Sequence, residues 1–240
     1  MIDSKNFKFD PVYDDFAETI AIDLLSFVKK AKMTNRTITK TFEYTEPLEF
    51  ILTIRMKTVE TFNPTKTKAF RYLPWEILNY KNRGFAIDSN SYVPDDLCPD
   101  IEVIVYIDRS INPQGYLTLY FKLIDDIRHE LEHLLQKGIN KLSGHISHTP
   151  VQVRESSDPY HYFLLDEEIP AMVAGMRASS IKRGIPIDEE FMDYLTPFIE
   201  FGLITEPQCL MIMNAWLNFA TEVYPNLKIS EKFMKTRKTG

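Results

Sequence analysis

Two histidines and the glutamate that follows the first of them are the residues of this chain whose types and spacing could do chemistry. They are His129, Glu130 and His133, in the pattern H-E-x-x-H. Residues four apart on an α-helix lie about 40° apart around its axis and about 6 Å along it, so two imidazoles placed in this way can converge on one tetrahedral zinc ion. Glu130 would stand beside the ion without binding it, and its carboxylate could take a proton from a water molecule there. The pattern therefore predicts zinc-assisted hydrolysis of a peptide bond.

A catalytic zinc site needs a third protein ligand, and four side chains compete for that position. Glu167 and Glu168 stand at the beginning of a helical pattern and would complete a site of two histidines and one carboxylate. His145 and His148 follow the H-E-x-x-H segment and would complete a site of three histidines. Without a metal, the two glutamates would complement the dipole of a helix N-terminus and the two histidines would belong to a polar surface loop.

The local sequence favours Glu168 among these four candidates. Pro170 must lie near the start of a helix, where its missing N–H costs least, so Glu168 would begin that helix. Beside the apolar stripe of this helix we expect a low face of small side chains, which would allow a close approach to the histidine helix: Ala171, Ala174 and Gly175. Glu167 lies only about 100° away around the axis, so geometry alone does not exclude it.

A peptidase also needs a hydrogen-bond donor for the oxyanion that forms when the carbonyl is attacked. Tyr160, His161 and Tyr162 stand close in sequence to the helix that would carry the third ligand. We expect Tyr160 and His161 to donate hydrogen bonds to this oxyanion. Glu130 would act separately, as the general base. The alternative is that these aromatic side chains pack under a loop.

Apolar periodicity predicts the elements that must position these residues. Helical patterns cover residues 10–32, 117–137, 167–183, 188–203 and 206–222. Segments 37–44 and 48–62 are rich in threonine, valine, isoleucine and phenylalanine, which is typical of strands. A third strand is predicted at 101–108, where four β-branched residues share one face: Ile101, Val103, Val105 and Ile107.

The order of these patterns is helix, strands and then helices, which predicts an α+β fold. We expect one domain over residues 1–240, because a chain of this length can bury one full core. Its part at 1–115 would hold the first helix and a small mixed sheet, and its part at 116–240 the active-site helix and the C-terminal helices.

Composition and charge restrict the class of protein. The apolar fraction is 44%, the charged fraction is 26%, and the net charge is −6. The two cysteines, Cys98 and Cys209, are too few for a disulfide scaffold and have no paired metal spacing, which favours a reducing compartment. Residues 1–11 show no signal peptide, and no apolar run has membrane-spanning length. We expect a cytoplasmic protein that acts on a peptide or protein and has no membrane or nucleic-acid partner.

Duplex DNA is expected to bind weakly at physiological salt. The net charge is −6, and outside the basic tail at 232–238 no cluster of lysine and arginine is visible. Titration of labelled duplex should give no sub-micromolar dissociation constant. A tight, salt-sensitive complex would contradict this prediction and would favour a protease that acts on proteins crosslinked to DNA.

The segment His129-Glu-Leu-Glu-His133, followed by Gln136, resembles the active-site helix of the zincin metallopeptidases. The resemblance implies a zincin-like α+β domain with one catalytic zinc ion and peptidase activity. The strand before that helix is similar to the zincin edge strand, which in the family holds the peptide substrate by backbone pairing. The segment Tyr162-Phe-Leu-Leu-Asp-Glu-Glu-Ile-Pro-Ala171 resembles the glutamate-bearing helix of the gluzincin branch, and its E-x-x-A step implies that Glu168 is the third ligand. Small zincin-like proteins of bacteria and phages are the most similar group.

Departures from related branches are clear. Gln136 and Ile139 stand where metzincins need a glycine and a histidine. Met172 stands four positions after Glu168, where thermolysin-like enzymes have an aspartate that orients a histidine. The group that orients the zinc-binding histidines must therefore come from elsewhere, for example from Asp126 or a backbone carbonyl.

Two other functions fit the same residues. A non-catalytic zincin-like protein could keep the histidine helix for folding or binding, but it would have little need of Glu130. A three-histidine protease of DNA-crosslinked proteins would use the Gly144-His145 pair. This pair resembles the Gly-His pair of that protease branch, which follows the histidine helix at a comparable distance in sequence. The acidic balance of the chain argues against this second alternative.

Overall fold

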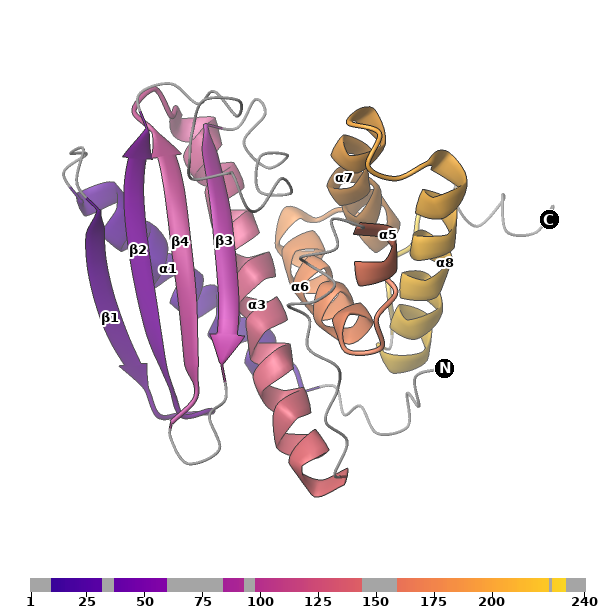
Figure 1. The fold of residues 1–240 in the computed structure, drawn as a ribbon, viewed down its shortest axis with the longest axis horizontal. Helices are drawn as coiled ribbons and strands as arrows, with labels where there is room; N and C mark the ends of the chain where they lie inside the picture. Colours follow the sequence, from indigo (N-terminus) through magenta and orange to yellow (C-terminus); the bar gives the residue numbers. More distant parts are fainter. Residues whose placement is uncertain are drawn as a thin grey trace. The chain divides into compact units, whose positions relative to one another are not determined.

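The computed structural model describes residues 10–31, 37–59, 84–92, 98–143, 159–224 and 226–231 (Figure 1). These residues form a mixed α+β structure, as the sequence predicts. The elements are α1 (Val12–Lys30), β1 (Ile38–Tyr44), β2 (Phe50–Val59), β3 (Phe85–Tyr92), β4 (Asp100–Asp108), α3 (Pro113–Ser143), α5 (Pro159–Tyr162), α6 (Glu168–Arg183), α7 (Ile187–Glu200) and α8 (Glu206–Val223). The chain divides into two compact units, one of residues Val12–Leu134 and one of Met1–Pro11 with Leu135–Gly240.

The first unit is built on a four-stranded mixed sheet with the strand order β1-β2-β4-β3. β1 and β2 are antiparallel, β2 and β4 are parallel, and β3 and β4 are antiparallel. The expectation that the strand before the histidine helix is an edge strand is wrong, because β4 lies between β2 and β3. Among the described strands, β1 and β3 form the edges.

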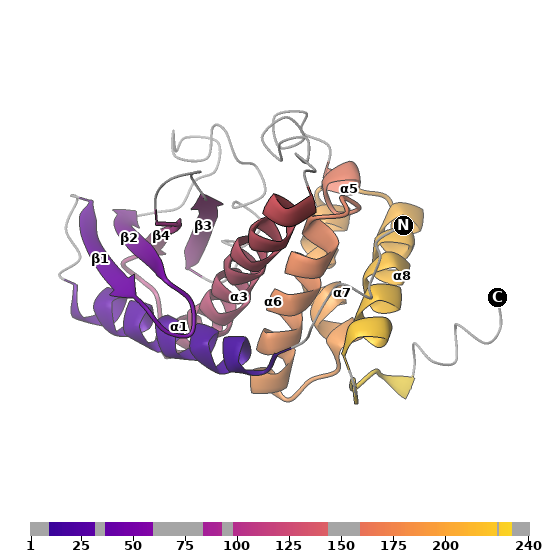
Figure 2. The same cartoon turned by 90° about the horizontal axis from the view of Figure 1, so that it is seen from below.

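One face of the sheet is apolar, and α1 and α3 lie on that side of it (Figure 2). Ile101, Val103 and Val105 of β4 are fully buried there, as their alternation predicts. Their neighbours on β2 in the same register are the fully buried Leu52, Ile54 and Met56. The opposite face carries polar partners, such as the ion pair of Arg55 with Glu102 at 2.6 Å. Period-two alternation therefore accounts for which face of the sheet receives the helices.

β3 is the strand that the sequence analysis did not predict. Phe85 and Ile87 point to the helix-covered face and are buried, but Ser89 and Ser91 continue the same row. The second half of β3 is therefore polar on both faces. The apolar alternation of the strand is limited to its first half, which is too short for a strand to be predicted from sequence. Pairing with β4, in which Ser89 lies opposite Val103, makes it a strand.

One ion pair and one hydrogen bond connect the two helices of the first unit. Arg128 of α3 is only 3% exposed, and it lies 3.2 Å from Asp14 of α1 and 2.8 Å from Glu132. Tyr120 of α3 also donates a hydrogen bond of 2.6 Å to Glu18 of α1. The contacts with α1 fix the histidine-bearing helix against its neighbour.

Replacing Arg128 by methionine is expected to lower the free energy of unfolding by about 3 kcal/mol, because two largely buried carboxylates would lose their cation. The matched control is Arg55→Met, whose ion pair is half exposed and should change stability by less than about 1 kcal/mol. Urea unfolding in the presence of a chelator measures both variants without any contribution from metal. Equal losses in the two variants would show that burial of the pair does not matter.

The second unit holds α5, α6, α7 and α8. The indole of Trp216 on α8 is fully buried, packs against Phe163 and Phe191, and donates a hydrogen bond of 2.9 Å to the carbonyl of Phe163. This bond anchors the segment that leads from α5 into α6.

The predicted helices at 10–32, 117–137, 167–183, 188–203 and 206–222 are confirmed, with ends that shift by a few residues. On α6 the residues from Glu168 to Met176 are all buried, so the expected apolar stripe and the low face of small side chains beside it both lie in the interior. Within the described residues, no helix combines the length and the apolar character that crossing a membrane requires.

Candidate metal centre

The two histidines of α3 are positioned for one ion. Their Nε2 atoms lie 3.0 Å apart, and their ring planes are nearly perpendicular, at 81°. Two nitrogens bound to one tetrahedral zinc ion, at about 2.0–2.1 Å each, would be about 3.3 Å apart. The spacing of four residues on the helix therefore brings the ring nitrogens to nearly the separation that zinc imposes. His129 is buried and His133 is half-buried.

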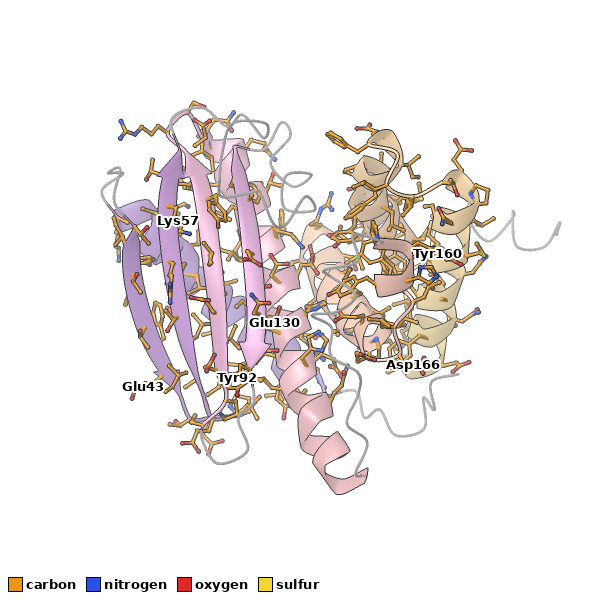
Figure 3. The ribbon with its side chains drawn as sticks, viewed as in Figure 1. Glu43, Lys57, Tyr92, Glu130, Tyr160 and Asp166 are labelled. Atoms are coloured by element: carbon orange, nitrogen blue, oxygen red, sulfur yellow. The ribbon has the colours of Figure 1, made fainter. Side chains whose placement is uncertain are left out.

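Glu130 lies beside the two histidines on α3 and next to the edge strand β3 (Figure 3). Its side chain is 2% exposed, and its Oε1 accepts a hydrogen bond of 2.9 Å from the hydroxyl of Ser89. A carboxylate at this depth is costly unless it has hydrogen-bond donors or nearby positive charge, and Ser89 supplies one donor. The glutamate of the motif is thus held by the sheet.

Asp126 lies one turn before Glu130 on the same helix. Its Oδ1 pairs with Lys122 at 2.7 Å, and the same ammonium group lies 2.6 Å from Asp125. Burial raises the pKa of Asp126 to about 7, the positive charge of Lys122 opposes that rise, and the negative charges of Asp125 and Glu130 add to it. The expectation that Asp126 orients a zinc-binding histidine stays a prediction.

Glu168 begins α6, as the position of Pro170 predicts. Its backbone N–H and that of Ile169 both donate to the carbonyl of Leu165, at 3.0 Å each, so a turn fixes the start of the helix. The side chain of Glu168 is 1% exposed, whereas that of Glu167, the residue before the helix, is half-buried. The two candidates that sequence spacing could not separate therefore differ in burial.

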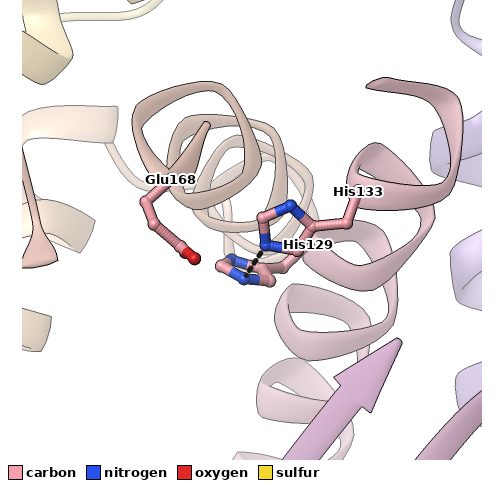
Figure 4. Close-up of side chains that lie close together, drawn as sticks. All are labelled: His129, His133 and Glu168. Carbon is pink, nitrogen blue, oxygen red and sulfur yellow. Dashed lines mark hydrogen bonds between the residues drawn. The ribbon is translucent and has the colours of Figure 1, made fainter. Parts of the chain in front are cut away.

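His129, His133 and Glu168 form a group that could hold a metal ion (Figure 4). Each offers one ligand atom, and the three atoms lie within 4.8 Å of one another. Two imidazoles and a carboxylate are a donor set that zinc accepts at catalytic sites, where a fourth position stays open. The chemistry of the donors thus fits a divalent metal, with zinc among the ions it suits.

Two other predicted site residues lie in the second unit. Tyr160 and His161 lie in α5, where the half-buried Tyr160 contacts Met211 Sδ through its hydroxyl at 3.5 Å and His161 is exposed. Their proposed role at the oxyanion stays a prediction. His145 and His148 lie outside the described residues, so the three-histidine alternative stays open.

Ser89 is the site residue that sequence reasoning missed. The signal was a serine in a row that begins with the apolar Phe85 and Ile87, at a position that faces the core. A polar residue in such a row needs a partner, and the partner here comes from the motif helix 41 positions later. Only recognition of β3 as a strand would have made this signal visible.

Comparisons of this chain with protein-family models, with curated proteins and with solved structures gave no match. Any statement about its function therefore depends on the residues of the site and their geometry.

Proposed function

We propose that this protein is a zinc-dependent metallopeptidase of the zincin type. The observation that carries the proposal is the pair of imidazole nitrogens 3.0 Å apart, with the buried carboxylate of Glu130 next to them on the same helix. A site that only stored or structurally used a metal would need the two histidines but not Glu130. The arrangement of two ligands with a non-ligand carboxylate supports hydrolysis.

His129 and His133 would hold the ion through Nε2, and Glu168 would supply the third ligand. When bound, zinc would act as a Lewis acid on a water molecule and on the carbonyl of the scissile peptide. Glu130 accepts a proton from the water and passes it to the amine that leaves. Tyr160 and His161 are the proposed donors to the oxyanion.

The peptide substrate is proposed to lie extended along β3. The zincin resemblance implies pairing of the substrate with an edge strand, and β4 cannot serve because its two neighbours occupy both of its sides. β3 is an edge among the described strands, and its Ser89 contacts Glu130. A peptide added to this edge would bind through backbone hydrogen bonds and pass close to the general base. The acidic charge and the two unpaired cysteines support a cytoplasmic location and argue against nucleic acid as a partner.

The test of this function uses the full chain, purified without added metal, stripped with a chelator and reloaded with one equivalent of zinc. Incubation with a broad peptide library, read by mass spectrometry, should show cleavage products that vanish after stripping and return with zinc. A chain that carries a full equivalent of zinc and cleaves no member of the library would refute the proposal.

A further inference from the structure

The side chains on one face of β3 are apolar at the start of the strand and carry hydroxyl groups further along, where the strand contacts Glu130. Phe85 is fully buried and Ile87 is 4% exposed, and both face the helices. The next residue in this row is Ser89, whose neighbour on β4 is the fully buried Val103. An apolar side chain would extend the core at this position. A serine gives up that packing and brings a donor to the helix instead.

The hydrogen bond that results joins the sheet to the motif helix. Glu130 is 2% exposed, so water has little access to compete for this contact. The Ser89 hydroxyl reaches Glu130 Oε1 at 2.9 Å from a side chain with a single heavy-atom rotation. Its backbone is fixed by pairing with β4 at Val103. The donor is therefore preorganised by the sheet.

We propose that Ser89 is a positioning residue for the general base: its hydrogen bond holds one carboxylate oxygen of Glu130 and so fixes where the other one accepts a proton. This inference rests on the proposed peptidase function. Proton transfer requires the base to lie within hydrogen-bond reach of the water, and a misplacement of about 1 Å can cost about 10²-fold in rate. A glutamate side chain has three rotatable bonds. A hydrogen bond at its carboxylate restricts its rotamers and so keeps the second carboxylate oxygen in one position.

A purely structural bond between Ser89 and Glu130 makes a different prediction. If the hydroxyl only offsets the burial of the carboxylate, its removal lowers stability and leaves turnover per folded molecule unchanged. If it positions the base, removal lowers kcat, leaves KM nearly unchanged and has no further effect once Glu130 has lost its basicity. Kinetics of zinc-loaded protein can separate these two cases.

The experiment compares Ser89→Ala, Ser89→Thr and Ser91→Ala in the Glu130 and Glu130→Gln backgrounds. Ser91 is the matched control, because it lies on the same face of β3 one position further along the row, opposite Ile101. Ser89→Ala should lower kcat by about 10- to 10²-fold with KM within about twofold, Ser89→Thr should recover most of the loss, and Ser91→Ala should behave as wild type. In the Glu130→Gln background, Ser89→Ala should add no further loss. An unchanged kcat in Ser89→Ala, or an equal loss in Ser91→Ala, would overturn the proposal.

A second measurement does not depend on peptidase activity. Carbon-13 labelled glutamate, with the Glu130 signal assigned by its loss in Glu130→Gln, reports the side-chain rotamer of Glu130 through its three-bond couplings. The zinc-loaded wild type and Ser91→Ala should show one rotamer, and Ser89→Ala should show averaged couplings. A single rotamer in Ser89→Ala would overturn the positioning role whatever the kinetics show. If the couplings average as expected while the wild type cleaves no peptide, the positioning role is supported and the proposed peptidase function fails.

Discussion

Replacing Glu130 by glutamine is expected to lower peptide hydrolysis by about 10²- to 10⁴-fold while leaving zinc content and the free energy of unfolding nearly unchanged. The amide cannot accept a proton from the water, but it has the same shape as the carboxylate. The carbonyl oxygen of the glutamine can still accept a hydrogen bond from Ser89, whose hydroxyl lies 2.9 Å from Glu130 Oε1 in the wild type. Because Glu130 is not a zinc ligand in the proposed site, metal binding should persist.

Glu132→Gln is the matched control on the same helix. Glu132 pairs with Arg128 at 2.8 Å, so its neutralisation should lower stability and leave kcat per folded chain unchanged. Kinetics on a cleavable peptide, elemental analysis and urea unfolding of both variants give the comparison. Full peptidase activity in Glu130→Gln would contradict the general-base assignment, and loss of zinc in that variant would mean that Glu130 is itself a ligand.

His129→Ala and His133→Ala are each expected to reduce bound zinc from about one ion per chain to a small fraction. Each variant should also lose the stability that the metal adds, which is about 3 kcal/mol when free zinc exceeds the dissociation constant about a hundredfold. The physical reason is that a metal that binds only the native state contributes its binding free energy to folding. The wild type stripped of metal is the control, and it should match the stability of the variants within the cost of removing an imidazole. Full zinc occupancy in either variant would contradict the ligand assignment.

The third ligand is tested in the same way with Glu168→Ala and, as its matched control, Glu167→Ala. Of the two glutamates, only Glu168 belongs to the group of possible ligands in the described residues, so replacement of Glu168 should release zinc and replacement of Glu167 should not. His145→Ala and His148→Ala test the alternative site and should keep their metal. Retention of zinc in Glu168→Ala together with its loss in His145→Ala would establish a three-histidine site instead.

Local periodicity was sufficient to predict several elements and part of the site. The apolar stripe at 117–137 predicted the helix α3. On any α-helix, the spacing of His129 and His133 brings their rings close together, whatever the rest of the chain does. The alternation of β4 predicted its buried face, and Pro170 predicted where α6 begins. These features depend on residues a few positions apart, whose geometry is the same in any protein.

Tertiary structure decided the features that join residues distant in sequence. The strand order placed β4 inside the sheet and β3 at its edge, since pairing among strands depends on the whole sheet and not on any one segment. Arg128 pairs with Asp14, which is 114 positions away in the sequence. Glu130 accepts a hydrogen bond from Ser89, which lies on β3, a strand whose apolar alternation is too short to predict from sequence. The sequence named Glu130 and Glu168 as candidates but neither Ser89 nor Asp14. Which residues meet is set by long-range packing, in which many weak contacts act together and which no local periodicity records.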